Sequence, residues 1–441
     1  MKNMKILFLI RSLKHFSYVS SIINALYDAG CHIDLRFDKD WSKTCSSGNV
    51  YKFIKGKEIT VDWFKKRTKS KSILLFREFL SCVNYVRIKG QSAFYRKRWF
   101  SYIPFYLRPL AYLFKPFYKH LCKVENRISP DKGIIEDITK LNPDYVIATP
   151  ANHRFSGEIE YIKAAKYLGI KTVIISLSWD NLTTKGMFHV KPDKLFVWND
   201  TQKNEAFYFQ NIQEQNISII GAPFFDKWLL PTMTEPRFEF CNRVGLNPFK
   251  SFMLYLGSSA NIIDDETWLI KELSLLFPEV EILVRPHPSN YKNYTWLSLK
   301  NVSVFPKDGS LPDDHASKAD FYNSIKYCVF AFGVNTSAMI DAIIHYRPCL
   351  TLIDERFKET QVEANHFSDL SKFLIVCNSF EEIKDHANKI MLNKKKVEDK
   401  RNEFVKKFIW PVKNYSAGRY MVDFLLDKTN KGELEDVKKT G

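Results

Sequence analysis

Residues 281–288 read Glu-Ile-Leu-Val-Arg-Pro-His-Pro, an apolar strand that stops at a basic residue, an imidazole and two prolines. Residues 329–342 read Val-Phe-Ala-Phe-Gly-Val-Asn-Thr-Ser-Ala-Met-Ile-Asp-Ala, which predicts a strand into Gly333 and a helix opening at Asn335. The N–H groups and positive dipole end of such a helix favour phosphate. Arg285 and His287 would add a charge and a titratable donor to the same crevice. The two stretches predict a nucleotide diphosphate site.

Strands and helices alternate on both sides of these stretches. Residues 5–10 and 32–37 predict strands around a helix at 17–29. Further strands are predicted at 144–149, 171–177, 194–198, 216–220, 252–257, 281–285, 327–332, 349–353 and 373–377. This alternation implies parallel sheets covered by helices on both faces. The predicted fold class is α/β, with two facing Rossmann-like domains.

A chain of 441 residues exceeds what one hydrophobic core usually supports. Prolines 231, 236 and 248 interrupt the periodicity between the two series of strands. We expect an N-terminal domain over 1–230, with an insertion over 43–130, and a C-terminal domain over 231–410. A crossover helix and a polar tail are expected over 411–441, after a charged helix at 394–407. The tail from residue 428 is expected to be disordered.

Basic charge is concentrated in one segment. Residues 43–127 hold 20 of the Lys and Arg residues and four acids, so this segment carries +16 of the net charge of +17. Its second half interleaves basic and aromatic residues, a composition typical of contact with an anionic membrane surface. An inserted helical subdomain with a solvated basic face is the alternative. Nucleic acid is not an expected partner, because no recognised nucleic-acid motif accompanies the charge.

Cysteine spacing and hydropathy indicate the compartment. The eight cysteines are widely separated, without the close pairs of a zinc site or the density of a disulfide framework, which favours reduced thiols in a cytosol. The apolar run at 6–10 is too short for a signal peptide. No run reaches the roughly 18 apolar residues of a membrane span. We expect a cytoplasmic protein that is peripheral on the inner face of the membrane.

The order of several motifs resembles that of GT-B glycosyltransferases. Arg-Pro-His-Pro at 285–288 followed by Asn-Thr-Ser at 335–337 is similar to bacterial capsule and lipopolysaccharide O-antigen enzymes, including relatives of the CDP-glycerol polyol-phosphate transferases. Residues 178–186, 221–226 and 361–367 resemble one branch of this group. The resemblance covers most of 130–427 but not the insertion. Where the family has an Arg-Pro-His-Gly-like stretch, residues 408–412 read Phe-Ile-Trp-Pro-Val, which argues against assuming the same donor.

The resemblance implies a donor site on the C-terminal half. Its phosphate ligands would be Gly257, Ser258, Ser259, Asn335, Thr336 and Ser337, with Arg285 neutralising charge and Asp341 binding ribose hydroxyls. His287 would be catalytic, donating to the leaving phosphate. The alternatives are that His287 caps its loop and that Asp341 is an exposed helix residue. Gln361 and His366 would close the nucleotide site or pack a loop.

An acceptor hydroxyl needs a base if configuration inverts at the sugar. The N-terminal half offers Asp180, His153 and His15 at strand ends, and we favour Asp180, with His153 as the second catalytic candidate. Trp179 would stack on a sugar face, and Asn181 and His15 would also contact the acceptor. The alternatives are that Asp180 and Asn181 cap their own backbone and that His15 is an ordinary loop residue.

No metal site is predicted. The acidic clusters at 264–265 and 313–315 stand at expected helix starts, where Asp is favoured as an N-cap. We therefore expect a metal-independent glycosyltransferase without a cofactor, moving sugar from a nucleotide donor to a lipid-linked surface glycan. A polyol-phosphate transferase on the same fold and a non-catalytic scaffold subunit of a polysaccharide assembly complex remain the alternatives.

Overall fold

The computed structural model describes residues 4–43, 48–66, 68–88, 92–312, 314–392, 402–412 and 415–426. The chain divides into two compact units. Unit 1 comprises Met1–Gln91, Tyr95–Leu229 and Lys406–Gly441, and unit 2 comprises Ser92–Phe94 and Leu230–Val405. Apart from Ser92–Phe94, the chain enters unit 2 after Leu229 and returns to unit 1 at Lys406.

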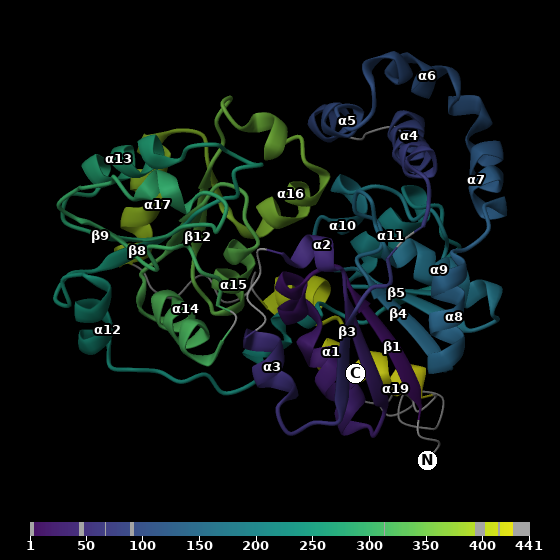
Figure 1. Cartoon of the computed structure of the whole chain (residues 1–441). Helices are drawn as coiled ribbons and strands as arrows, with labels where there is room; N and C mark the ends of the chain where they lie inside the picture. The colour runs from purple at the N-terminus through teal and green to yellow at the C-terminus, as the bar shows by residue number, and fades with distance from the viewer. Residues whose placement is uncertain are drawn as a thin grey trace, which may run out of the picture. The chain divides into compact units, whose positions relative to one another are not determined.

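Unit 1 is built on a seven-stranded sheet in the order β3-β2-β1-β4-β5-β6-β7 (Figure 1), and every pairing is parallel. The strands are β1 (Lys5–Ile10), β2 (His32–Phe37), β3 (Ile59–Trp63), β4 (Tyr145–Thr149), β5 (Lys171–Ile175), β6 (Lys194–Val197) and β7 (Ile217–Ile219). The helices outside the insertion are α1 (Phe16–Asp28), α2 (Lys39–Ser42), α8 (Lys132–Leu141), α9 (Glu158–Tyr167), α10 (Asn181–Thr184), α11 (Asp200–Tyr208) and α19 (Ala417–Leu425). Alternate residues of β1 belong to two separate apolar clusters, so both faces of the sheet are buried.

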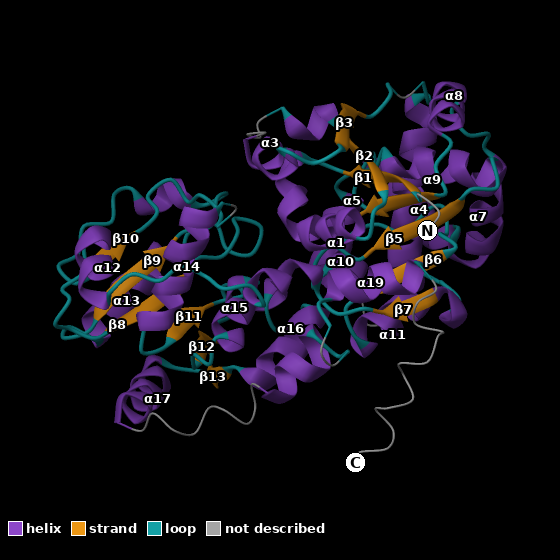
Figure 2. Cartoon of the chain, turned by 90° about the horizontal axis from the view of Figure 1, so that it is seen from below, coloured by secondary structure: helices purple, strands orange, loops and turns teal. Residues whose placement is uncertain are grey.

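Unit 2 repeats the plan with six parallel strands in the order β10-β9-β8-β11-β12-β13 (Figure 2). The strands are β8 (Phe252–Leu256), β9 (Glu281–Arg285), β10 (Val302–Val304), β11 (Ala331–Gly333), β12 (Cys349–Leu352) and β13 (Ile375–Cys377). The helices are α12 (Arg237–Val244), α13 (Thr267–Leu276), α14 (His315–Tyr327), α15 (Ala338–Ile344), α16 (Asn365–Leu370) and α17 (Phe380–Leu392). The predicted class of two Rossmann-like, parallel-sheet domains is confirmed.

The expected crossover helix is α19, which lies against α1 in unit 1 (Figure 1). Asp226 accepts the backbone N–H groups of Ala417 and Gly418 at 3.0 and 2.9 Å, and the indole N–H of Trp410 at 3.0 Å. A Cβ on Gly418 would lie 2.8 Å from the Ser21 backbone. The motif at 221–226 therefore fastens the C-terminal helix to the first domain.

The insertion contributes both a strand and a helical group. It contains α3 (Gly48–Ile54), β3, α4 (Lys71–Arg87), α5 (Ala93–Phe100), α6 (Arg108–Leu113) and α7 (Tyr118–Arg127), with short 3-10 turns at Phe105–Leu107 and Lys115–Phe117. β3 extends the sheet by pairing with β2, so the insertion is more than a helical subdomain. In the described part of the chain, every helix is too short or too polar to cross a membrane. The expected helix at 394–407 and the tail from 428 lie largely or wholly outside the described residues.

Candidate active site

Three loops that follow neighbouring parallel strands meet at the carboxyl edge of the unit 1 sheet. His15 follows β1, His153 follows β4, and Asp180 follows β5. The rings of His15 and His153 lie 6.0 Å apart between centroids, edge to face. The structure therefore brings together the three predicted candidates of the N-terminal half.

Both imidazoles are neutral at neutral pH. Burial, assisted by the positive charges of Arg11 and Lys185, lowers the pKa of His15 to about 4. Burial first, and then Lys185 and Arg11, holds the pKa of His153 well below its usual range. The Nε2 atom of His153 is buried and has no hydrogen-bond partner within the described chain. A neutral imidazole with an unengaged nitrogen can accept a proton or a hydrogen bond from a ligand.

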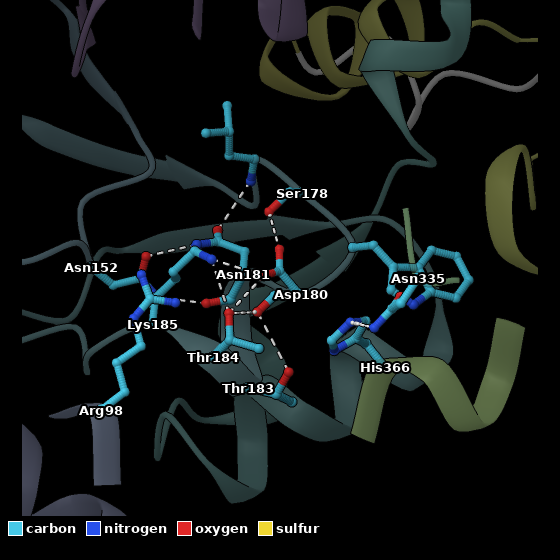
Figure 3. Close-up of polar contacts among 12 residues, drawn as sticks. Arg98, Asn152, Ser178, Asp180, Asn181, Thr183, Thr184, Lys185, Asn335 and His366 are labelled. Atoms are coloured by element: carbon cyan, nitrogen blue, oxygen red, sulfur yellow. Dashed lines mark hydrogen bonds and ion pairs between the residues drawn. The ribbon is translucent and has the colours of Figure 1, made fainter. Parts of the chain in front are cut away.

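The Asp180 carboxylate is held by three donors (Figure 3). The Ser178 hydroxyl donates to it at 2.7 Å, the Thr184 hydroxyl at 2.7 Å and the Lys185 ammonium at 2.8 Å. These contacts tie the β5 loop to the first turn of α10. Asp180 thus orders its own loop, as the capping alternative expected. The donors differ from that expectation, because they are side chains rather than backbone N–H groups.

The Asn181 side chain is fully buried (Figure 3). Its oxygen accepts the Leu177 N–H at 3.0 Å, and its nitrogen donates to the Asn152 side-chain oxygen at 2.7 Å. The Asn152 nitrogen donates in turn to the backbone oxygens of Asn181 and Gly186. Asn181 therefore joins the β4 and β5 loops, and this geometry does not present it to an acceptor.

Trp179 is half-buried among aromatic rings. Its ring lies 6.3 Å from that of Trp198 and 5.7 Å from that of Phe408. The Gln202 amide donates to its backbone oxygen at 3.2 Å. Phe408 belongs to residues 408–412, where the sequence departs from the resembled family. Its ring packs beside Trp179 and so supports the loop that follows β5. Stacking of Trp179 on a sugar remains a prediction.

The loop that carries His153 has unusual backbone geometry. Ala151 and Phe155 adopt left-handed φ values of 56° and 51°, a strained conformation that is common beside functional groups. The Phe155 N–H donates to the buried Glu78 carboxylate of α4 at 3.0 Å. Glu78 was not predicted as a site residue, and nothing in the sequence near it shows that α4 reaches this loop. Arg11 and Lys185 were also missed, although each lies in or beside a quoted motif.

In unit 2, His287 follows β9 with a defined orientation. The Ser289 backbone N–H donates to His287 Nδ1 at 3.1 Å, and the Ser289 hydroxyl lies 2.8 Å from the same atom. Burial lowers the pKa of His287 to about 4. Because Nδ1 accepts, we infer that the proton of the neutral ring is on Nε2, which leaves that atom as a donor. His287 both caps its loop and retains a donor for a ligand.

The predicted phosphate turn packs tightly on the His287 loop. The Gly257 N–H donates to the Arg285 carbonyl at 2.9 Å, and a Cβ on Gly257 would lie 3.0 Å from the His287 nitrogen. The Ser258 N–H donates to buried Glu266 at 2.6 Å. Ser259 is half-buried at the end of the turn. The glycine is needed for the close approach of the two loops, and two of the three amides are already bonded within the protein.

Arg285 and Asp341 are both buried. The Arg285 guanidinium donates to Ser324 at 3.2 Å and lies over the Phe321 ring at 5.0 Å, both on α14. Burial lowers its pKa to about 10. The structure thus places this cation against a helix rather than at the loops that would hold phosphate. Asp341 is 3% exposed, so the alternative of an exposed helix residue is wrong.

Asn335 begins a polar cluster around α15 (Figure 3). Its amide nitrogen donates to the Thr360 carbonyl at 2.7 Å and lies 3.3 Å from His366 Nε2. The Gln361 amide donates to the Val334 carbonyl at 2.9 Å, which fixes the same loop. Thr336 is half-buried, and Ser337 is exposed at the N-cap of α15. Gln361 and Thr360 therefore hold the turn that carries Asn335.

The acidic clusters act locally where the structure describes them. Asp314 caps α14 by accepting the N–H groups of Ala316 and Ser317, and Asp265 accepts the Thr267 N–H. Within the described ranges, no group of three or more His, Cys, Asp or Glu side chains is placed to hold a metal ion. Residue 313 lies outside those ranges.

No family model and no curated protein sequence matches the chain. Solved structures match it along nearly its whole length. The UDP-GlcNAc 2-epimerase of Methanocaldococcus jannaschii is 15% identical, with 96% of this chain and 100% of that chain covered at a TM-score of 0.54. The UDP-GlcNAc 2-epimerase of Neisseria meningitidis, bound to UDP-GlcNAc, is 12% identical, with 96% and 100% covered at 0.55.

A glycosyltransferase from Rickettsia africae ESF-5 is 13% identical, with 98% of this chain and 100% of that chain covered at a TM-score of 0.55. Likeness at such identities shows the fold alone. These proteins match the chain across both of its parallel-sheet units. The fold is therefore of the GT-B class.

Proposed function

We propose that the protein is a glycosyltransferase that moves a sugar from a nucleotide donor to a surface glycan, with unit 2 binding the donor and unit 1 the acceptor. The observation that carries this proposal is the placement of polar side chains at the carboxyl edges of both parallel sheets, the usual ligand position of such sheets. The fold is shared with structures that bind UDP-GlcNAc, which supports a nucleotide-sugar donor.

The described side chains suggest a division of roles. His153 would accept the acceptor's hydroxyl proton as the new C–O bond forms at the anomeric carbon. His287 Nε2–H would donate to the departing diphosphate as the C–O bond to phosphate breaks. Arg11 and Lys185 supply positive charge near His153. We propose that these steps proceed without a metal ion or cofactor.

The donor site is tested by thermal unfolding with UDP, CDP, GDP, dTDP and CMP. A nucleotide at about a hundred times its dissociation constant stabilises the folded state by about 2.7 kcal/mol. We expect one diphosphate to stabilise the wild type and to lose its effect in His287→Ala, but not in His386→Ala. His386 is a half-buried histidine of α17 in the same unit. The same stabilisation in both variants would contradict the assignment.

Product analysis then separates the reaction classes. Release of a nucleoside diphosphate that depends on an acceptor supports glycosyl transfer, whereas a nucleoside monophosphate from a CDP-polyol supports a polyol-phosphate transferase. Conversion of a nucleotide sugar without acceptor or nucleotide release would indicate an epimerase, as the UDP-GlcNAc 2-epimerases with this fold are named. Absence of any nucleotide effect would favour the scaffold role.

The insertion supports a membrane-linked acceptor. Residues 105–117 expose large apolar side chains, among them Phe105 at 76%, Tyr106 at 61% and Leu113 at 65%. Arg108 and Lys115 are exposed in the same stretch, and Lys119 is exposed just after it. Aromatic and basic side chains together suit the boundary of an anionic bilayer. We propose that this stretch, the aromatic–basic ridge, holds the enzyme on the cytoplasmic face where a lipid-linked glycan is presented.

Vesicle sedimentation tests this part of the proposal. The protein should bind phosphatidylglycerol-containing vesicles more tightly than phosphatidylcholine vesicles, and added salt should weaken the binding. Combined Phe105→Ser and Leu113→Ser substitutions should release it. Equal binding to neutral and anionic vesicles, or unchanged binding by the substituted protein, would contradict the ridge as a membrane contact.

A further inference from the structure

A recess lies on unit 1, at the edge of the sheet opposite to the candidate active site. It has a volume of about 900 Å³ and is bounded by residues 126–130, 190–193 and 211–213 and by side chains of α9. Asp193 and Asn216, which also line it, directly precede β6 and β7, whereas Asp180 follows the carboxyl end of β5. We call it the amino-edge groove. Its size is within the range of small-molecule sites.

The lining combines aromatic rings with amides. Tyr167 is 69% exposed and Phe207 is 47% exposed, and both border the groove. Asn126, Asn211 and Gln213 supply amide groups beside them. An exposed ring offers a face for the C–H groups of a pyranose, while amides donate to and accept from its hydroxyls. These residue types together match the chemistry of a carbohydrate.

The groove is also positively charged. Four basic side chains line it. Lys166 is paired with the lining Asp193 at 2.6 Å and Lys163 with buried Glu125 at 3.1 Å, so the excess charge is that of Arg127 and Lys191. Arg127 is exposed, and Lys191 donates to the Phe188 carbonyl at 3.0 Å. Burial lowers the pKa of Lys191 to about 8, and its ammonium donates to the Phe188 and Gln210 carbonyls rather than to a carboxylate. A negatively charged group in the groove would supply a counter-charge.

We propose that the amino-edge groove binds a negatively charged oligosaccharide at a site separate from the candidate active site. Tyr167 and Phe207 would contact sugar faces, and exposed Arg127 would face a carboxylate group of the ligand, with the positive charge of Lys191 beneath the groove. The site would hold a glycan without acting on its bonds. This inference goes beyond the proposed transfer reaction and does not depend on which donor unit 2 uses.

Calorimetric titration of the full-length protein tests the proposal. The probes are a tetrasaccharide of alternating glucuronate and N-acetylglucosamine, neutral chitotetraose, and inorganic phosphate. We expect the charged tetrasaccharide to bind more tightly than the other two. Tyr167→Ala and Arg127→Ala should each weaken it about tenfold, the loss of one stacking or charge contact. Tyr51→Ala, at a tyrosine 58% exposed on α3, should bind like the wild type.

Three results would overturn the proposal. They are no binding of the charged tetrasaccharide, equal affinity for phosphate alone, and unchanged affinity in both Tyr167→Ala and Arg127→Ala. If chitotetraose binds as tightly as the charged tetrasaccharide, negative charge on the ligand is not needed. That result would overturn the proposal of a negatively charged oligosaccharide. Stabilisation by nucleotide should be unchanged in Tyr167→Ala and Arg127→Ala. The nucleotide experiment therefore tests the donor site independently of the groove.

Discussion

At the scale of single residues, partners determine which candidate side chains can act on a ligand. In the sequence, Arg285 and Asn181 looked similar to His287 and His153, because each stands at or shortly after the end of a strand. In the structure, Asn181 and Arg285 are hydrogen-bonded to the buried side chains of Asn152 and Ser324. The two histidines keep a ring nitrogen for a ligand or for proton transfer. Strand-end position alone does not separate these two outcomes.

The orientation of His287 predicts different effects for two substitutions. Asn places an acceptor near the Nδ1 position, whereas Gln places a donor near Nε2. If Nε2–H serves the leaving phosphate, His287→Gln should retain turnover within about tenfold, and His287→Asn should lose about a hundredfold or more. Steady-state turnover with the donor found by thermal unfolding provides the measurement. The reverse order would show that loop capping through Nδ1 is the main role.

Glu78 predicts a pH-dependent stability. Burial raises its pKa in the folded state from 4.5 to about 7, so folding is favoured by protonation and this contribution is lost as pH rises through about 7. Glu78→Gln should therefore gain free energy of unfolding relative to wild type, by up to about 3 kcal/mol, on going from about pH 5 to about pH 8. Urea unfolding at both pH values checks this. A difference that is independent of pH would exclude ionisation of Glu78 as the cause.

At the scale of elements, the C-terminal helix depends on one close approach. The Cβ of an alanine at 418 would lie 2.8 Å from the backbone carbon and oxygen of Ser21, which cannot yield as a side chain could. Gly418→Ala should cost about 1–3 kcal/mol through overpacking between α19 and α1. Gly133→Ala is the matched control, because its Cβ would meet only Asp131 Oδ1 at 3.5 Å. Equal urea midpoints for both variants would contradict the packing argument.

Element prediction succeeded where apolar runs were strong. β1 and β2 have the predicted bounds, and the helix predicted at 17–29 is α1 (Phe16–Asp28). β3 was missed because it is an edge strand whose residues are mostly exposed, so the segment reads as charged and irregular. β10 has three residues, none fully buried. Short strands without a buried face leave little hydrophobic signal in the sequence.

At the scale of the whole molecule, the basic insertion, apart from Ser92–Phe94, is part of unit 1. Arg77 of α4 bonds Glu160 of α9 at 2.7 Å and Glu125 of α7 at 3.0 Å, and Lys163 bonds Glu125 at 3.1 Å. All four side chains are buried. Removing residues 43–127 would therefore leave buried Glu160 without Arg77, buried Lys163 without Glu125, and the edge of β2 without β3. Surface substitutions are the cleaner test of membrane binding.

This network predicts a large effect of one substitution. Arg77→Ala removes a positive charge that balances the buried carboxylates of Glu125 and Glu160. Breaking such a buried ion pair lowers the free energy of unfolding by about 3–5 kcal/mol. Arg108→Ala, at an exposed position of α6, should change the free energy of unfolding little. Urea unfolding of the two variants makes the comparison. A small effect of Arg77→Ala would show that the insertion and the sheet are held mainly by apolar contacts.

The amino-acid sequence by itself determined the α/β class, the two series of strands and the residues that end each strand, because these depend on local hydrophobic periodicity and on turn residues. It also located the basic segment and its aromatic residues. Only the tertiary structure decided that Arg285 packs against α14, that Asn181 pairs with Asn152, and that Glu78 supports the His153 loop. These outcomes arise from burial and hydrogen bonds between residues far apart in the chain, which local patterns do not encode.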